Sequence, residues 1–143
     1  MAGDIKVESY KRSVEKITDN WAKKVEKLAK ELAPIDEELD KLEAIEEPSP
    51  DDEKRIAELT KKRAEIRKKM DTAGMEFRVD LMLIEVPTEA NEKELVKLPA
   101  WFKEIVKKKG IPLGKHVTLV PDLDIDFKKK KVKSAGITLK WEF

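Results

Sequence analysis

A regular stripe of large apolar residues runs through the first third of the chain, and it limits what this part can fold into. The spacings between its members alternate between four and three, with one additional four. The stripe consists of Tyr10, Val14, Ile17, Trp21, Val25, Leu28, Leu32, Ile35, Leu39 and Leu42. Nearly all residues between them are Lys, Glu, Asp or Ala, which are compatible with a helix and keep its other face polar. The pattern predicts a long helix that buries one narrow face in a coiled coil.

A second helix is predicted to begin directly after Ser49. This residue can act as an N-cap, Pro50 suits the first helical position, and three acidic residues follow in the first turn. Apolar residues then recur at heptad spacing, and Gly74 is the expected C-terminal cap. Antiparallel folding about Ser49 would bring the two apolar stripes together. We expect a two-helix coiled-coil hairpin over residues 1–74, with its tip near residues 46–50.

Two residues weaken this hairpin at one level. Pro34 interrupts the first helix, where it removes a backbone hydrogen bond, although the apolar spacing continues on both sides of it. We expect a kink at Pro34, with a full break as the alternative. On the second helix, Arg63 replaces an apolar residue opposite Ile35, where its charged head can reach solvent or a nearby carboxylate.

Residues 75–143 are predicted to form a small mixed β-sheet in the order β-α-β-β. Residues 77–86 are apolar on both faces of an extended chain, which is typical of a central strand. Residues 91–109 show a broad apolar helical face, and Pro99 is expected to break this helix into two pieces. The broken helix would cover one face of the sheet.

The two remaining strands are predicted in residues 116–127 and 137–143, which both alternate apolar and polar side chains. They can pair across the polar turn formed by residues 128–131. That pairing would set Gly136 opposite Leu123. We therefore expect a bent or bulged hairpin.

The predicted fold class is α+β, with the helical hairpin followed by a small α+β sheet unit in residues 75–143. A chain of 143 residues is too short for two full domains. The second helix is expected to end opposite Val25, which leaves four apolar residues of the first helix uncovered: Tyr10, Val14, Ile17 and Trp21. We expect the sheet unit to pack against residues 5–25 and cover them, so that the chain forms one structure. A homo-oligomer or a different protein that contacts these four residues is the alternative.

Charge is unevenly distributed, although the formal net charge is only +1. Residues 36–53 contain ten acidic residues and one basic residue, Lys41. Some of these acids crowd the end of the first helix, where the helix dipole disfavours them, so helix preference alone does not explain the cluster. A negative tip can steer a basic partner surface towards it. The candidate partner-binding residues are Glu43, Glu46, Glu47, Asp51, Asp52 and Glu53.

The sequence contains no catalytic or metal-binding signature. It has no Cys and one His, which removes thiol chemistry and argues against a His-based zinc or triad site. Asp122, Asp124 and Asp126 have the spacing that opens a calcium loop, but the Gly and Glu that an EF-hand needs further on are absent. These carboxylates fit a solvated strand face, and His116 fits a structural or exposed position. We expect no enzyme activity, no cofactor and no metal.

Clustered lysines are the basis of an alternative function, weak nucleic-acid binding. They are Lys107, Lys108, Lys109, Lys128, Lys129, Lys130, Lys131 and Lys133. Cations grouped in this way can bind phosphate. However, the aromatic residues of this half fall on apolar faces and not among the lysines, where bases could stack on them. Nucleic acid is therefore the less favoured partner.

No stretch of the chain has the length and hydropathy of a membrane span, and the first residues lack the apolar core of a signal peptide. A cytoplasmic protein without membrane contact is expected. Together these features predict a non-enzymatic protein–protein interaction module of adaptor, chaperone, inhibitor or immunity type. Its acidic coiled-coil tip would contact a protein partner with a basic surface.

Overall fold

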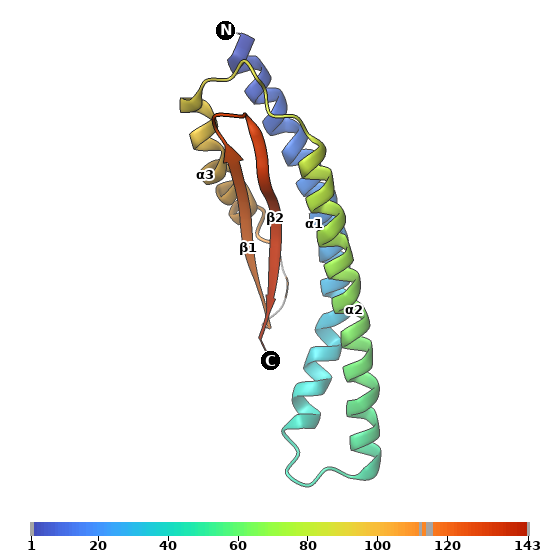
Figure 1. Cartoon of the computed structure of the whole chain (residues 1–143). Helices are drawn as coiled ribbons and strands as arrows, with labels where there is room; N and C mark the ends of the chain where they lie inside the picture. The colour runs from blue at the N-terminus through green and yellow to red at the C-terminus, as the bar shows by residue number, and fades with distance from the viewer. Residues whose placement is uncertain (1, 112, 114–115, 143) are drawn as a thin grey trace.

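The chain folds into three helices followed by a two-stranded sheet. The computed structural model describes residues 2–111, 113 and 116–142. The helices are α1 (Ala2–Glu43), α2 (Pro50–Leu83) and α3 (Glu92–Lys109), and the strands are β1 (Val117–Asp126) and β2 (Lys131–Trp141). α1 and α2 form a long antiparallel hairpin, and the sheet and α3 lie together along one side of it (Figure 1). The α+β class is confirmed.

The predicted helical hairpin is also confirmed, and its register agrees with a turn centred on Ser49. Arg63 lies 3.9 Å from a carboxylate oxygen of Asp36, beside the level where the polar interruption was expected. The apolar seam on either side of it is buried, with Leu32 and Leu39 from α1 and Leu59 and Ile66 from α2. α1 passes through Pro34 as one continuous helix. The alternative of a full break at Pro34 is therefore wrong.

α2 continues beyond Gly74, so the predicted strand over residues 77–86 is wrong. The buried residues of α2 keep a helical spacing to the end of the helix: Leu59, Ile66, Met70, Ala73, Phe77 and Leu81. An extended chain would place Val79 and Leu83 on the same face as Phe77. In the structure these two side chains are 57% and 75% exposed, whereas Phe77 is 2% exposed. The expected boundary at residue 74 consequently falls inside a helix.

The longer α2 covers the apolar residues of α1 that had no predicted partner. The ring of Phe77 stacks on Trp21, with the ring centroids 5.1 Å apart. Tyr10, Val14 and Trp21 are buried and Ile17 is partly buried, in one core that also includes residues of α3 and of both strands. The cover is part of the same chain. These four residues therefore give no reason to expect a second copy at this place.

α3 is a single helix, so the predicted break at Pro99 is wrong. The Asn91 side chain caps its start by accepting a hydrogen bond from the Glu94 backbone N–H at 3.0 Å. Gly110 ends it in the left-handed conformation, with φ of 55°. The buried face of the helix consists of Leu95, Leu98, Phe102 and Val106. Burial of this face offsets the hydrogen bond that Pro99 cannot make.

The sheet consists of β1 and β2 in antiparallel pairing, so the predicted mixed sheet in β-α-β-β order is wrong. A bulge is present, as expected, but it lies between Asp124 and Ile125. Gly136 pairs with Asp122, one residue away from its predicted partner Leu123. The predicted last strand extended to Phe143, which lies outside the described residues.

The sheet touches the helices on one face and along one edge. Leu123 and Ile125 of β1 and Ala135 and Ile137 of β2 belong to the core, and α3 contacts β1 while α2 contacts β2. At Gly136 the side chain of Arg78 from α2 lies so close that a Cβ atom would be 3.2 Å from its Nε atom. None of the described helices combines the length and apolar character needed to cross a lipid bilayer.

Candidate protein-interaction surface

The six predicted partner-binding residues gather at one end of the helical hairpin. α1 ends at Glu43 and α2 begins at Pro50, which places all six on or beside the turn between the helices. α1 and α2 continue beyond the end of the sheet, so this end projects from the rest of the molecule (Figure 1). The acidic tip is the set Glu43, Glu46, Glu47, Asp51, Asp52 and Glu53. Five of its members are exposed and Asp52 is partly buried.

Asp52 is partly buried because it closes a capping box with Ser49. The Asp52 carboxylate accepts a hydrogen bond from the Ser49 backbone N–H at 3.0 Å, and the Ser49 hydroxyl accepts one from the Asp52 backbone N–H at 3.1 Å. Pro50 occupies the first turn, where its missing N–H costs nothing. Asp52 therefore fixes the start of α2, and it is less available to a partner than the other acids of the tip.

The other acids of the tip carry negative charge that nearby cations do not balance. Among the described residues, no basic group lies within ion-pair distance of Glu43, Glu46, Glu47, Asp51 or Glu53. Lys41, the only cation of residues 36–53, pairs with Glu37 at 3.4 Å. Exposed carboxylates without such partners direct their field into solvent, where it can act on an approaching molecule.

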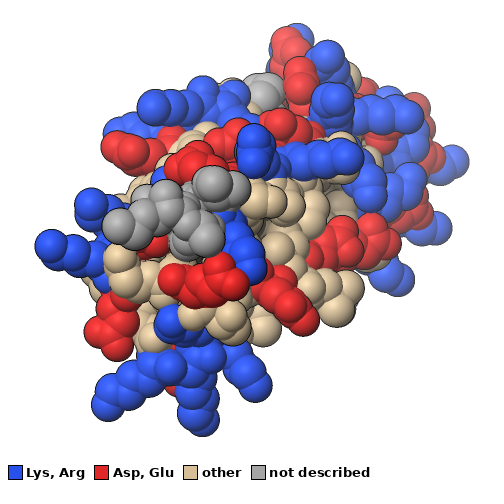
Figure 2. All heavy atoms as spheres, turned by 90° about the horizontal axis from the view of Figure 1, so that it is seen from above, with Lys and Arg blue, Asp and Glu red and all other residues tan. Residues whose placement is uncertain are grey.

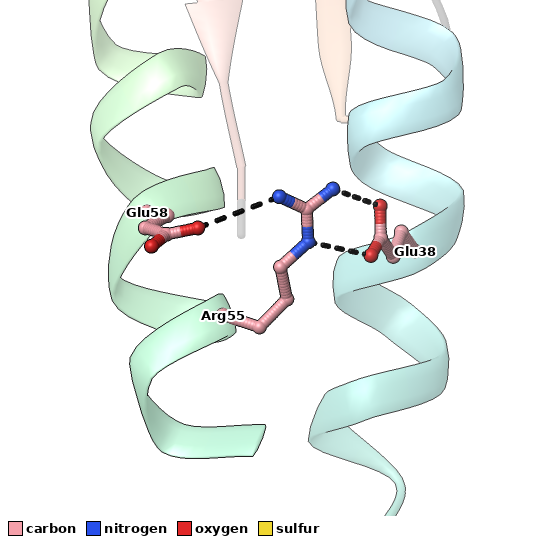
Figure 3. A network of polar contacts seen from close by, with 3 residues as sticks. All are labelled: Glu38, Arg55 and Glu58. Atoms are coloured by element: carbon pink, nitrogen blue, oxygen red, sulfur yellow. Dashed lines mark hydrogen bonds and ion pairs between the residues drawn. The ribbon is translucent and has the colours of Figure 1, made fainter. Parts of the chain in front are cut away.

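An arginine behind the tip links the two helices. The Arg55 guanidinium of α2 donates to both carboxylate oxygens of Glu38 on α1, at 2.7 and 3.0 Å, and it lies 3.5 Å from Glu58 (Figure 3). The hydrogen bond from Arg55 lowers the pKa of Glu38, and the same contact raises the pKa of Arg55. The paired geometry fixes the orientation of the guanidinium as well as its position. The sequence pattern does not single out this residue, although Arg55 lies close behind three consecutive acids.

One apolar side chain lies within the acidic turn. Ile45 is 40% exposed, and its backbone N–H bonds to the carbonyl of Leu42 at 3.2 Å. Exposed single apolar residues are common on protein surfaces. At this position, however, Ile45 is surrounded by acidic residues, and a bound partner could bury its side chain. Protein interfaces often combine an apolar centre with a polar rim.

The opposite end of the molecule has a different charge distribution. Figure 2 looks onto this end, where basic and acidic side chains are mixed around uncharged surface. Pairs of opposite charge occur there, such as Lys6 with Glu89 at 2.7 Å. The uniform sign at the tip is therefore not a general property of this charged surface.

The lysine segments proposed for nucleic acid are not brought together. Residues 107–109 form the last turn of α3, whereas Lys130 donates to the carbonyl of Thr88, which precedes the start of that helix. The two segments are therefore separated by about the length of α3, roughly 27 Å at 1.5 Å per residue. Lys109 also pairs with Asp19.

The tryptophans of this half lie under cations of other elements. Lys11 lies 5.4 Å from the ring centre of Trp101, and Arg67 lies 5.3 Å from that of Trp141. These rings consequently do not form a stacking platform among the lysine segments, which a single-stranded nucleic acid would use.

Three of the remaining chemical candidates, His116, Asp122 and Asp126, make contacts within the chain. His116 Nδ1 lies 2.9 Å from the Glu142 carbonyl, and its Nε2 lies 3.8 Å from Asp40. Asp122 accepts a hydrogen bond from the Ser134 hydroxyl at 2.7 Å on the exposed face of the sheet. Asp126 accepts the backbone N–H groups of Lys128 and Lys129, and the bond from Lys129 is the main reason that its pKa is lowered.

Within the described part of the chain, no three His, Cys, Asp or Glu side chains are grouped so that they could hold a metal ion. Comparison with known proteins does not add a candidate site. No protein-family model, no curated protein and no solved structure matches this chain.

Proposed function

We propose that this chain is a non-enzymatic protein-interaction module whose acidic tip contacts a basic surface of a protein partner. The observation that carries the proposal is the set of exposed carboxylates at the projecting end of the hairpin, which no described cation pairs. The two helices hold these charges beyond the end of the sheet (Figure 1), so a partner can approach them without meeting the sheet or α3.

The physical role of the tip is to attract and orient the partner. Like charges concentrated on one end increase the rate of encounter with a basic surface, and salt weakens this effect. Ile45 then offers a small apolar contact once the partner has bound to the carboxylates. We expect the carboxylates to act mainly on the association rate and Ile45 mainly on the dissociation rate.

The test compares two variants with the same change in net charge. The first replaces Glu43, Glu46 and Glu47 by Lys, and the second replaces Glu15, Glu31 and Glu104 by Lys. The control residues are likewise exposed carboxylates without a described ion pair, but they lie within helices and away from the tip. Asp52 is left unchanged because it caps α2.

Proteins retained by the wild-type chain from a lysate of its native host are identified, and their association rates are measured at two salt concentrations. We expect the tip variant to lose these partners, or to bind them at least tenfold more slowly at low salt, while the control variant keeps them. Unchanged binding by the tip variant, with circular dichroism showing intact helices, would contradict the proposal.

A further inference from the structure

One side of α2 carries a regular alternation of acidic and basic side chains. An acid recurs every seven residues, and a base follows each acid four residues later. The series is Asp51, Arg55, Glu58, Lys62, Glu65 and Lys69. We call these six residues the charged stripe. Because their spacings alternate between four and three, they lie on one side of the helix, beside its apolar seam.

The charged stripe faces away from the sheet, which lies along one side of the hairpin (Figure 1). Arg67 of α2 contacts this sheet, because its guanidinium lies over the ring of Trp141 in β2. Lys69 follows Arg67 by two residues, about 200° around the helix, so it points to the other side. Five members of the stripe are exposed, and Arg55 is partly buried.

Contacts within the chain leave most of these charges available. Arg55 lies 3.5 Å from Glu58 and also binds Glu38 of α1. Lys62 and Lys69 each follow a glutamate of the stripe by four residues, a spacing at which helical ion pairs form. However, no described carboxylate lies within ion-pair distance of either lysine. The alternation is therefore not explained by ion pairs along the helix.

A groove between α1 and α2 lies beside one half of the charged stripe. It is a hollow of about 670 Å³, with Leu28 and Ala73 as its apolar part, and on α2 it extends from Glu65 to Glu76. Four lysines line it against three glutamates, and one of these glutamates, Glu76, pairs with Lys24 at 3.6 Å. The other lining lysines are Lys27, Lys68 and Lys69. The groove combines an apolar floor with a small excess of positive charge.

We propose that a second copy of this chain binds along the charged stripe, antiparallel to the first, with the two-fold axis at the level of Thr60. Every member of the stripe then faces an opposite charge, and the axis repeats each contact. The pairs are Asp51 with the partner's Lys69, Arg55 with the partner's Glu65, and Glu58 with the partner's Lys62. A displacement by seven residues in either direction keeps only two of these three pairs. A parallel pair would place each residue opposite its own copy, acid against acid.

The same arrangement gives the acidic tip a basic surface. Pro50, the first residue of α2, lies opposite the partner's Met70, which is within the part of α2 that borders the groove. The turn that carries Ile45 therefore lies over the lysines and the apolar floor of that groove. To this extent the inference rests on the proposed function, because it names a second copy of the chain as the partner of the tip.

The contact is mainly electrostatic, which sets its strength. Exposed ion pairs contribute little individually, and salt screens them. We therefore expect reversible dimerisation with a dissociation constant in the high micromolar range, weakened as the salt concentration rises.

The first test measures the solution mass of the full chain by sedimentation at increasing protein concentration. The wild type should shift from monomer to dimer at low salt, and about 0.5 M salt should return it to monomer. Glu58→Lys and Lys62→Glu should each weaken dimerisation at least fivefold, because each change sets like charges opposite each other twice. Both residues lie outside the acidic tip, so these variants test the pairing alone.

An equimolar mixture of the two variants is the decisive sample. In a mixed dimer every pair is again of opposite charge, so the mixture should dimerise as the wild type does. Glu104→Lys is the control, because Glu104 is an exposed glutamate on α3 and takes the same change in charge. It should dimerise as the wild type does, and circular dichroism should show intact helices in all variants.

The second test determines the register by cross-linking carboxylates directly to amines with a carbodiimide. Asp51 and Lys69 are about 27 Å apart along α2, so a bond between them forms only between two chains. Mass spectrometry of the cross-linked wild type should detect this bond at low salt and lose it at high salt.

Three results would overturn the proposal. The first is a wild type that stays monomeric at all concentrations at low salt, and the second is a mixture of Glu58→Lys and Lys62→Glu that dimerises no better than either variant alone. The third is a dimer without the bond between Asp51 and Lys69. In each case the tip and control variants described above still decide the proposed function with proteins of the host.

Discussion

The two ends of the helical hairpin share one apolar pattern but are stabilised differently. In the part that lies against the sheet and α3, the core is continuous along α1 from Val7 to Leu32. Towards the tip, Leu39 and Leu59 are also buried, but they lie outside that core. Near the tip, ion pairs also join α1 and α2, between Arg55 and Glu38 and between Arg63 and Asp36.

From this difference we expect a heptad seam between two helices to contribute less stability than the core shared with the sheet and α3. Isolated helices of moderate length are marginal in water, and most helical stability in proteins comes from packing of the apolar face. We call the part of the hairpin that lies against the sheet and α3 the supported part. We therefore expect destabilising substitutions in the supported part to unfold the whole molecule. Substitutions towards the tip should loosen only residues 41–58.

The largest effect is expected for Phe77→Ala in the supported part. Phe77 is 2% exposed and stacks on Trp21, so truncation leaves a cavity at the junction of α1 and α2. We expect the free energy of unfolding to fall by about 3–5 kcal/mol. Urea unfolding measures it, with Val79→Ala on the exposed side of the same helix as control. A loss below about 1 kcal/mol would show that the supported part does not depend on this contact.

A smaller effect is expected for Gly136→Ala, where the sheet meets the hairpin. Gly136 has φ of +149°, which L residues rarely adopt, and an added Cβ would lie 3.2 Å from Arg78 Nε. We expect a loss of about 1–3 kcal/mol in urea unfolding. Adding Arg78→Ala should recover only the steric part of this loss. Full recovery would show that the backbone conformation carries no cost.

Tyr10 in the supported part should make the stability of the fold depend on alkaline pH. Burial raises the pKa of Tyr10 to about 12, against 10.0 for the exposed side chain. The unfolded chain therefore ionises first, and the folded state loses stability as the pH rises from 10 towards 12. At pH 11 this loss amounts to about 1 kcal/mol. Tyr10→Phe should lack it, so the stability difference between the two proteins should change between pH 9 and pH 11. A constant difference would contradict the burial of this hydroxyl.

The smallest effect is expected for Arg55→Ala near the tip. Arg55 and Glu38 are both more than one third exposed, so the melting temperature should change by about 2 °C or less. Amide exchange over residues 41–58 should nevertheless become faster, while exchange around Phe77 stays unchanged.

This local effect should depend on pH in one direction. Arg55 lowers the pKa of Glu38 below its ordinary value of 4.5, so the contact stabilises the folded state above that pH. The stabilisation is lost as the pH falls through the lowered pKa. The exchange difference between wild type and Arg55→Ala should disappear in the same range. A difference that persists in acid would assign the effect to packing of the arginine stem.

Local signals predicted the hairpin well because they act within a few residues. Ser49 and Pro50 start α2 through contacts with the next turn, and Asn91 and Gly110 bound α3 in the same way. The exposed placement of the acidic tip also followed from its position at the turn. Arg55 was missed because its partner Glu38 becomes a neighbour only after the hairpin has formed.

The errors occurred where distant contacts decide between two local patterns. Residues 77–83 are apolar at a spacing suited to a strand and also at one suited to a helix, and Gly74 suggests a stop. The stacking of Phe77 on Trp21, more than fifty residues away, favours the helix. α3 continues through Pro99 for a related reason, because burial of the α3 face outweighs one missing hydrogen bond.

The capping box restricts how natural variation can act at the tip. Position 52 needs a side chain that can accept a hydrogen bond from the Ser49 N–H, so its acid is tied to folding. Positions 46 and 47 have no such duty among the described contacts and can change with the partner. In orthologous chains that serve different partners, we would expect Ser49 and Asp52 to persist together while the charges at 46 and 47 diverge.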